Sequence, residues 1–511
     1  MVDASTPILV GCGDITDMET PIERGRSPYD LTADAARLAI RDAAASKLPA
    51  VIDTVAMVRT FAETSPRFAT RLGKSANPPK SIANRLGIRA RRHIYTWGGG
   101  NMPQYLVNML AESIARGETQ VALIAGGEAL RTQYGVERAG LPVSWNEDPG
   151  GVPEVVGDSR RGWSDLEERY NIRAAINFYP LIENAIRASR ENSIESHMNS
   201  MARLLANFSD VAVGNPLATR RERFSAGRLA TIDADNRWIG FPYTRLMIAN
   251  AFIDQAAAVV MTSVGKAREL CIAESKWIYL HGCSDAHDHW HLSERPDLQA
   301  SPAIRSASRQ ALDMAGKTLA ELEFLDIYSC FPSAVEISCR EIGLSESDPR
   351  GLTVTGGLIY FGGPGNNYVT HSISEMMRRL RSSPGSFGMV TANGNYITKH
   401  SFGVYSATPP RKPWQRQHPS NLQSQLNALP REHLAESPSG SAKIETFTVM
   451  HGRDGPEFSI IFGRLDSTGE RFIAKTSSDR NVLLDLQERE SLGRPGIVEP
   501  LDRLNHFRLS A

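Results

Sequence analysis

The chain carries the same order of apolar and polar positions twice. In the first copy, the apolar run 8–11 predicts a buried strand, and Ser27-Pro28 begins a segment in which apolar residues recur at helical spacing. In the second copy, the apolar run 277–280 is followed by Ser301-Pro302 and a segment of the same periodicity. Serine before a proline in the first turn is a typical helix start. Each copy is therefore predicted to begin with a strand and a helix.

The two copies also continue alike. In each copy a glycine-rich run, a helix and a strand are predicted next, in that order. They lie at 98–100, 102–116 and 121–124 in the first copy, and at 362–365, 368–380 and 387–390 in the second. Asn101 is the predicted N-cap of the first of these helices, and Gly117 is placed to end it. Repeated strand–helix units predict mainly parallel sheets covered by helices.

Three segments lie outside the repeat. Residues 140–246 are rich in polar helix formers and predict an inserted helical region that covers one end of the sheets. A Pro-, Gln- and Ser-rich stretch at 409–440 predicts a linker. Beyond it, three apolar runs with turn signals between them predict a small β-barrel, at 446–449, 458–465 and 471–474.

Charge and cysteine content narrow the class of protein. The 511 residues include 57 basic and 57 acidic side chains, so the surface offers no general attraction to nucleic acid or to an anionic membrane. We see no apolar run of the ~18 residues that a membrane helix needs and no signal peptide at the N-terminus. The five scattered cysteines argue against a disulfide framework or a zinc site. We therefore expect a reduced, cytoplasmic protein without a metal.

Three segments resemble the thiolase superfamily, in the order and repeat register that the family shows. They are the glycine loop, helix and Ala-Gly-Gly strand end of 97–129, the Asp-Ile-Tyr-Ser-Cys-Phe segment of 326–331, and the Gly-Gly … Gly-Gly-Pro-Gly segment of 356–365. The second is similar to the His-Asp-Cys-Phe segment of sterol-carrier-protein-type thiolases. The resemblance covers roughly residues 5–408, and 443–476 resemble an OB-fold domain that accompanies thiolase-like proteins.

The resemblance implies an α/β fold with a five-layered αβαβα duplicated core, an inserted loop domain and an additional, OB-like C-terminal β-barrel. The domains expected from it are an N-terminal half, a C-terminal half, a linker and the additional domain, at 1–275, 276–408, 409–440 and 441–511.

The same resemblance implies a chemistry that this chain cannot perform in the usual way. Thiolases form an acyl-thioester on a cysteine at a helix N-terminus, and further catalytic groups move protons and stabilise oxyanions. The nucleophile position falls on Gly100 or Asn101, and Cys12 and Cys271 are the nearest cysteines along the chain. The Gly-His-Pro histidine falls on Gly363, the second catalytic cysteine on Ala392, and the histidine of His-Asp-Cys-Phe on Tyr328. Ordinary thiolase turnover is therefore not expected.

Several groups near these positions could still carry chemistry. The catalytic candidates that remain are His400, Cys330, Tyr328 and Asn393. The alternative interpretations are structural: a hydrogen-bonded histidine, a small buried cysteine and a left-handed turn at Asn393. Asn366, Asn367 and His371 are expected to cap the helix that follows them. The run His281 to His291 has metal-like spacing, but we interpret it as a solvated loop.

CoA-binding candidates follow from the resemblance as well. Arg220, Arg223 and Arg228 fall in the region that holds the CoA phosphates in thiolases, although a solvated helix face explains them equally well. Asn250 lies where the pantetheine arm passes, and Gly363 lines the same channel.

The resulting hypothesis is a thiolase-like acyl-CoA-binding protein of the acetyl-CoA acetyltransferase type, with a role in lipid metabolism. CoA or an acyl-CoA is the expected ligand, and no further cofactor is required. The alternatives are a non-catalytic CoA-binding protein and a subunit that depends on a thiolase-like partner. Whether the chain is an enzyme stays open, and the family resemblance makes a homodimer the default assembly.

Overall fold

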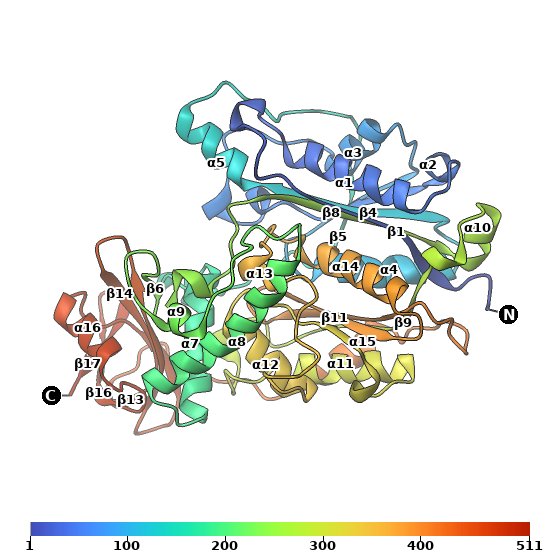
Figure 1. Cartoon of the computed structure of the whole chain (residues 1–511). Helices are drawn as coiled ribbons and strands as arrows, with labels where there is room; N and C mark the ends of the chain where they lie inside the picture. The colour runs from blue at the N-terminus through green and yellow to red at the C-terminus, as the bar shows by residue number, and fades with distance from the viewer. Residues whose placement is uncertain (1, 511) are drawn as a thin grey trace.

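The two sequence copies form the two halves of one layered core (Figure 1). The computed structural model describes residues 2–510. The first half consists of β1 (Pro7–Thr16), α1 (Pro28–Asp42), β2 (Thr54–Met57), α3 (Pro78–Leu86), β3 (Arg92–Thr96), α4 (Met102–Ala115), β4 (Val121–Ala129) and β8 (Asp254–Ser263). The second half consists of β9 (Ile278–His287), α11 (Pro302–Ala315), β10 (Phe324–Asp326), α12 (Pro332–Ile342), α14 (Tyr368–Ser382), β11 (Phe387–Gly394) and β12 (Lys399–Ser406).

The strands form one ten-stranded sheet in the order β10-β11-β12-β9-β1-β8-β4-β2-β3-β5. The two halves join where Ile8 and Leu9 of β1 pair with Tyr279 and Ile278 of β9. The prediction of mainly parallel sheets was wrong for the middle of this order, where β1, β8 and β4 pair antiparallel and β12 pairs antiparallel with both neighbours. The reason is that the connections before β8 and β12 return the chain to the end of the sheet that it has just left, through the long insertion after β4 and through a short turn after β11.

Five layers follow from this arrangement (Figure 1). Helices α1 and α3 cover the outer face of the first half, and α11 and α12 cover that of the second. Helices α4 and α14 lie between the halves and contact strands of both. The apolar stripe of α4 is buried from both sides, which explains why Leu106, Val107 and Leu110 have no exposed surface. The predicted five-layered α/β core is confirmed.

A matching close approach of strand and helix occurs in both halves. A Cβ on Gly11 of β1 would lie 2.1 Å from the carbonyl oxygen of Ala39 in α1. A Cβ on Gly282 of β9 would lie 1.9 Å from that of Ala311 in α11. Glycine is therefore required at the equivalent position of each copy. Both helices begin at the predicted serine caps, because Ser27 and Ser301 accept hydrogen bonds from the first turn.

The insertion between β4 and β8 is largely helical, as predicted. It contains α5 (Leu130–Ala139), β5 (Glu154–Val156), α6 (Asp165–Arg169), α7 (Ala175–Ser189), α8 (Ile194–Gly214), α9 (Ala226–Ala230), β6 (Trp238–Gly240) and β7 (Tyr243–Thr244). Strand β5 extends the main sheet by pairing with β3, and Arg92 of β3 holds Glu154 of β5 through contacts of 3.0 to 3.2 Å.

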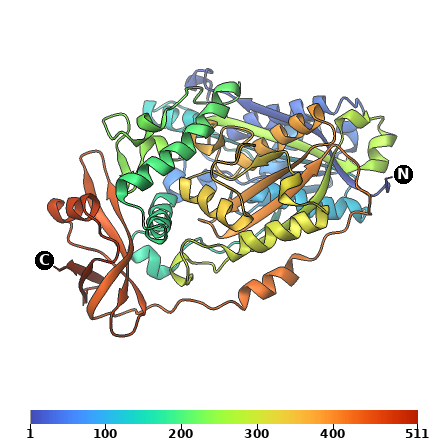
Figure 2. The ribbon, with the colours of Figure 1, turned by 60° about the horizontal axis from the view of Figure 1, so that its bottom comes forward.

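The C-terminal domain is an antiparallel sheet at one end of the molecule (Figure 2). It consists of β13 (Gly440–His451), β14 (Pro456–Leu465), β15 (Arg471–Ala474), α16 (Arg480–Glu488), β16 (Pro495–Leu501) and β17 (Leu504–Leu509). The strand order is β15-β14-β13-β16-β17, and a bridge between Lys475 and His506 draws the two edges together. The preceding segment is not structureless, because it forms α15 (Pro419–Asn427) against β9.

Two sets of contacts hold the C-terminal domain to the core. Strand β6 of the insertion pairs with β13, at Gly240 and Met450. The fully buried guanidinium of Arg471 in β15 donates to Glu445 (2.7 Å) and to the carbonyl oxygens of Ser293 (3.0 Å) and Pro296 (3.1 Å) in the second half. Among the described residues, none of the helices is long and apolar enough to cross a bilayer.

Candidate functional site

The glycine loops of the two halves meet at the start of α4. The amide of Gly99 donates to Oδ1 of Asn366 (3.0 Å), whose Nδ2 donates to the carbonyl of Arg59 (2.8 Å). Asn367 donates to the carbonyl of Gly126 (2.7 Å). The expectation that these asparagines cap α14 was wrong, since its N-cap, Asn367, makes no capping bond with its side chain. They tie the two halves together instead.

His371, the third residue expected to cap α14, does not cap it either. It lies inside α14, and its Nδ1 is 2.9 Å from Oδ1 of Asp14 in β1. Both side chains are 1% exposed. His371 therefore contributes to the packing of α14 against the first half.

The predicted nucleophile position has no room for a side chain. A Cβ on Gly100 would lie 2.2 Å from Oη of Tyr328 and 2.6 Å from the carbonyl oxygen of Asn393. Asn101 is the N-cap of α4, but it makes no capping bond, and its Oδ1 is buried without a hydrogen-bond partner among the described residues. Tyr328 thus fills the space that a side chain at position 100 would need.

A buried polar group surrounds Tyr328. Nδ2 of Asn393 donates to Oη of Tyr179 on α7 (3.0 Å), and Oδ1 of Asn393 accepts from the amide of Ile397 (3.1 Å). The thiol of Cys330 neighbours the Tyr179 hydroxyl, and burial raises the pKa of Cys330 to about 12. The thiol is therefore protonated near neutral pH. The predicted left-handed turn lies at 395–397 instead of at Asn393, which belongs to strand β11.

His400 and Lys399 are neighbours on β12 and face opposite sides of the sheet. Nε2 of His400 lies 3.3 Å from Oδ2 of Asp288 and 3.5 Å from Oγ of Ser301, the N-cap of α11. His400 therefore makes the contacts of its structural alternative, a hydrogen-bonded histidine, on the side of β12 away from Gly98. Nζ of Lys399 instead donates to the carbonyl of Gly98 (2.5 Å). Burial lowers the pKa of Lys399 to about 8.

Lys399 is the residue of this site that sequence reasoning missed. The signal was the alternation of side chains along β12, which places one of two adjacent residues toward α4.

The predicted pantetheine segment runs beside this group. The amide of Ala249 donates to the carbonyl of Cys330 (3.1 Å), and the amide of Gly363 donates to the carbonyl of Asn250 (2.9 Å). A Cβ on Gly363 would find its nearest neighbours at 3.4 to 3.5 Å, so this position tolerates a side chain. Ala392 lies in β11 opposite Ser401.

The three candidate arginines differ in their surroundings. Arg223 pairs with Asp210 (2.8 Å) and Arg228 pairs with Asp233 (3.0 Å). Arg220 is half-buried, and its Nη1 has no hydrogen-bond partner among the described residues. Its amide donates to the carbonyl of Tyr360 (2.9 Å). Arg220 therefore differs from Arg223 and Arg228, because it is not paired with a carboxylate among the described residues.

The histidine-rich run begins inside strand β9 and not in a solvated loop. Residues up to His287 belong to the strand, and Cys283 is 1% exposed. Nε2 of His281 lies 2.7 Å from the carbonyl oxygen of Thr408, and Asp285 pairs with Arg416. The apolar run 277–280 was too short to reveal the full strand.

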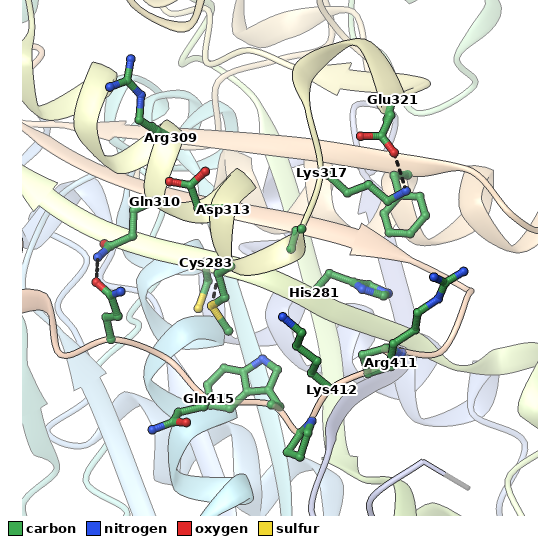
Figure 3. A pocket seen from close by; sticks show the side chains of 18 of the residues that line it. His281, Cys283, Arg309, Gln310, Asp313, Lys317, Glu321, Arg411, Lys412 and Gln415 are labelled. Carbon is green, nitrogen blue, oxygen red and sulfur yellow. Dashed lines mark hydrogen bonds and ion pairs between the residues drawn. The ribbon is translucent and has the colours of Figure 1, made fainter.

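A cavity of about 1150 Å³ lies between α11 and the segment 408–417 (Figure 3). Its lining includes the charged side chains Arg309, Asp313, Lys317, Arg411 and Lys412. Gln310 and Gln417 bridge its rim through a hydrogen bond of 2.8 Å. The segment also carries Arg416, which approaches Glu112 near the C-terminal end of α4. At 1.5 Å per residue, Glu112 lies roughly 15 Å along the helix from Met102, its first residue, so the cavity is separate from the start of α4.

Comparisons with known proteins agree with this architecture. Residues 421–502 match the "thiolase-like protein type 1 additional C-terminal domain" family, and residues 284–364 match the "thiolase C-terminal domain-like" family. The crystal structure of a monomeric SCP2-thiolase like protein type 1 from Mycobacterium smegmatis is 36% identical, over 100% of both chains, with a TM-score of 0.85. An acetyl-CoA acetyltransferase from Syntrophomonas wolfei shares the fold at 16% identity, over 80% of this chain and 100% of that one, with a TM-score of 0.57.

Curated relatives match over shorter stretches. A 3-ketoacyl-CoA thiolase of Erwinia tasmaniensis is 31% identical over 153 residues, which are 27% of this chain and 33% of that protein. A probable acetyl-CoA acetyltransferase of Mycobacterium tuberculosis is 32% identical over 135 residues, which are 26% of this chain and 31% of that protein. The chain thus spans about a third of the length of these relatives.

Proposed function

Because this chain belongs to the thiolase superfamily, as a thiolase-like protein with an additional C-terminal domain, we propose that it binds CoA thioesters at the start of α4 without cysteine-based acyl transfer. The observation that carries this proposal is the contact between Gly100 and Tyr328. A side chain at position 100 would overlap the tyrosine hydroxyl, and position 101 holds an asparagine, so neither candidate position supplies the cysteine that a thiolase needs.

The nearby thiol does not replace the missing group. With a pKa of about 12, Cys330 carries about one thiolate in 10⁵ molecules at pH 7, and the thiolate is the reactive form. The buried site favours the non-catalytic alternative over the acetyltransferase alternative. A CoA thioester would meet the amide-rich start of α4, where the helix dipole favours a partly negative carbonyl oxygen.

Arg220 is the best-placed phosphate ligand of this proposal. Its guanidinium has no carboxylate partner among the described residues, so a CoA phosphate would be its first charged partner, whereas Arg223 and Arg228 are already paired with aspartates. The following segment, with Ala249 and Asn250, then runs to Cys330 and Gly363, beside Tyr328.

Calorimetric titration with CoA and acetyl-CoA tests the proposal. The wild type should bind both, and Arg220→Ala should weaken binding about tenfold or more, since a hydrogen bond to a charged group contributes about 1.5–3 kcal/mol. Arg223→Ala is the matched control and should bind as the wild type does. Absence of binding by the wild type would refute the proposal. Cleavage of acetoacetyl-CoA by the wild type would refute its non-catalytic part.

We further propose that the chain acts as a monomer. Strand β5 covers the edge of β3 and is itself only three residues long, so this end of the core sheet offers a second copy only a short edge. The relative from Mycobacterium smegmatis is described as monomeric. Light scattering coupled to size exclusion should give a mass near 56 kDa, and a mass near twice that value would overturn the proposal.

A further inference from the structure

Helices α7, α8 and α12 bring two carboxylates and one imidazole together away from the start of α4. Glu183, His197 and Glu336 are 0%, 0% and 1% exposed. One nitrogen or oxygen atom of each lies within 4.8 Å of those of the other two. Since α7 and α8 belong to the insertion and α12 to the second half, the three residues lie at the junction of these two parts.

The charges around this cluster do not balance. Arg190 donates to Glu336 (3.1 Å) and to Glu346 (2.5 Å), so one guanidinium serves two carboxylates. The other arginine of this part of α7, Arg187, pairs with Glu490 (2.5 Å). With Glu183 included, three carboxylates share the single charge of Arg190. Glu346 is partly exposed, so the buried carboxylates that lack full compensation are Glu183 and Glu336, and buried charge is costly unless it is compensated.

One carboxylate oxygen of this cluster also lacks a partner. Oε2 of Glu336 is buried without a hydrogen-bond partner among the described residues. Oε1 of Glu183 lies 2.5 Å from Nε2 of His197. The hydroxyl of Tyr243 donates to the other oxygen of Glu183 (2.5 Å) and lies 2.7 Å from Oγ of Ser333, which fixes the orientation of this carboxylate. Ligand carboxylates in metal sites are commonly oriented in this way.

We propose that Glu183, His197 and Glu336 bind one divalent transition-metal cation that fastens the insertion to the second half. A single divalent ion carries two positive charges, which match the two buried carboxylates of Glu183 and Glu336. One imidazole with two carboxylates suits Zn²⁺ and its first-row neighbours, whereas Mg²⁺ and Ca²⁺ prefer oxygen ligands alone. We assign the metal a structural role, because the site is sealed from solvent.

The test uses the full chain produced in medium with added Zn²⁺, because a sealed site is filled during folding. Elemental analysis of the purified protein should find about one zinc per chain in the wild type. Glu336→Gln should lose it, while Glu341→Gln, a buried glutamate on the same helix outside the cluster, should keep it. His197→Gln should also lose the metal, and it provides a second variant if Glu336→Gln does not fold.

A spectroscopic readout separates the metal from a proton shared between the two glutamates, which is the competing way to reduce the charge. Protein produced with Co²⁺ should show visible d–d absorption bands that Glu336→Gln abolishes. Folded wild type with less than about a tenth of an equivalent of metal from media supplemented with Zn²⁺, Mn²⁺ or Co²⁺ would overturn the proposal. A Glu336→Gln protein that melts higher than the metal-supplemented wild type would overturn it as well.

Discussion

Replacing Gly100 by alanine or cysteine should unfold the site instead of activating it. The new Cβ would lie 2.2 Å from the Tyr328 hydroxyl, whereas ordinary contacts begin near 3.4 Å. Tyr328 would have to withdraw by about 1 Å from a buried position in a close-packed interior. The carbonyl of Asn393, at 2.6 Å, cannot yield easily, because Asn393 belongs to β11 and is paired with His400 of β12.

The magnitude follows from the two clashes together. Overpacking a well-packed core costs about 1–3 kcal/mol, and a clash with strand backbone places Gly100→Ala near the upper end. Gly363→Ala is the matched control, because its Cβ finds its nearest neighbours at 3.4 Å. We expect the control to lie within about 1 kcal/mol of the wild type, helped by the lower entropy of its unfolded chain.

Urea denaturation followed by fluorescence measures both variants. The combination of Gly100→Ala with Tyr328→Ala should recover part of the loss, since it removes one of the two clashes, and a double-mutant cycle quantifies this coupling. Gly100→Ala as stable as the wild type would refute the reasoning. So would a Gly100→Cys protein that cleaves acetoacetyl-CoA, because it would show that the space for a nucleophile exists.

Three further predictions concern buried charges. Burial lowers the pKa of Lys399 from 10.5 to about 8, so the unfolded chain binds more protons between these pH values and the free energy of unfolding should rise with pH across that window. Lys399→Met should remove this slope and add up to about 3 kcal/mol of stability at pH 7, less the contribution of the hydrogen bond to Gly98. Denaturation at several pH values measures both effects. Burial raises the pKa of Glu128 from 4.5 to about 8, so the free energy of unfolding should fall as the pH rises through that window. In the same assay, the stability of Glu128→Gln should not change with pH in this window, and a slope like that of the wild type would contradict the raised pKa. Arg471→Ala leaves the carbonyl oxygens of Ser293 and Pro296 without their donor, while Glu445 keeps Arg464 (3.0 Å). It should cost about 1–3 kcal/mol, with faster proteolytic cleavage in 409–440, and wild-type protease resistance would contradict it.

Local signals predicted much of the fold. The serine caps at Ser27 and Ser301, the paired glycine loops and the helices between the halves follow from residues close together in the chain, and the structure confirms them. The strand pairings did not follow, because β8 and β12 return antiparallel and nothing in their own sequences shows which neighbour they join.

The site was predictable only in outline. The sequence showed that no cysteine is available, but the contact between Gly100 and Tyr328 joins residues far apart in the chain and required coordinates. The sequence pointed to His400 because it follows the last glycine turn, but in strand β12 it is the adjacent Lys399 whose side chain reaches Gly98, before α4. The cluster of Glu183, His197 and Glu336 went unnoticed because its members come from three helices.

The pairing of β6 with β13 has a consequence for biosynthesis. Gly240 leaves the ribosome about 210 residues before Met450, which corresponds to roughly 10–40 s at ordinary rates of translation. During this interval the insertion presents an unpaired strand edge, and edges of this kind promote association between nascent chains. The C-terminal domain therefore completes the fold of a segment made long before it, and truncation ahead of Gly440 would leave that edge permanently open.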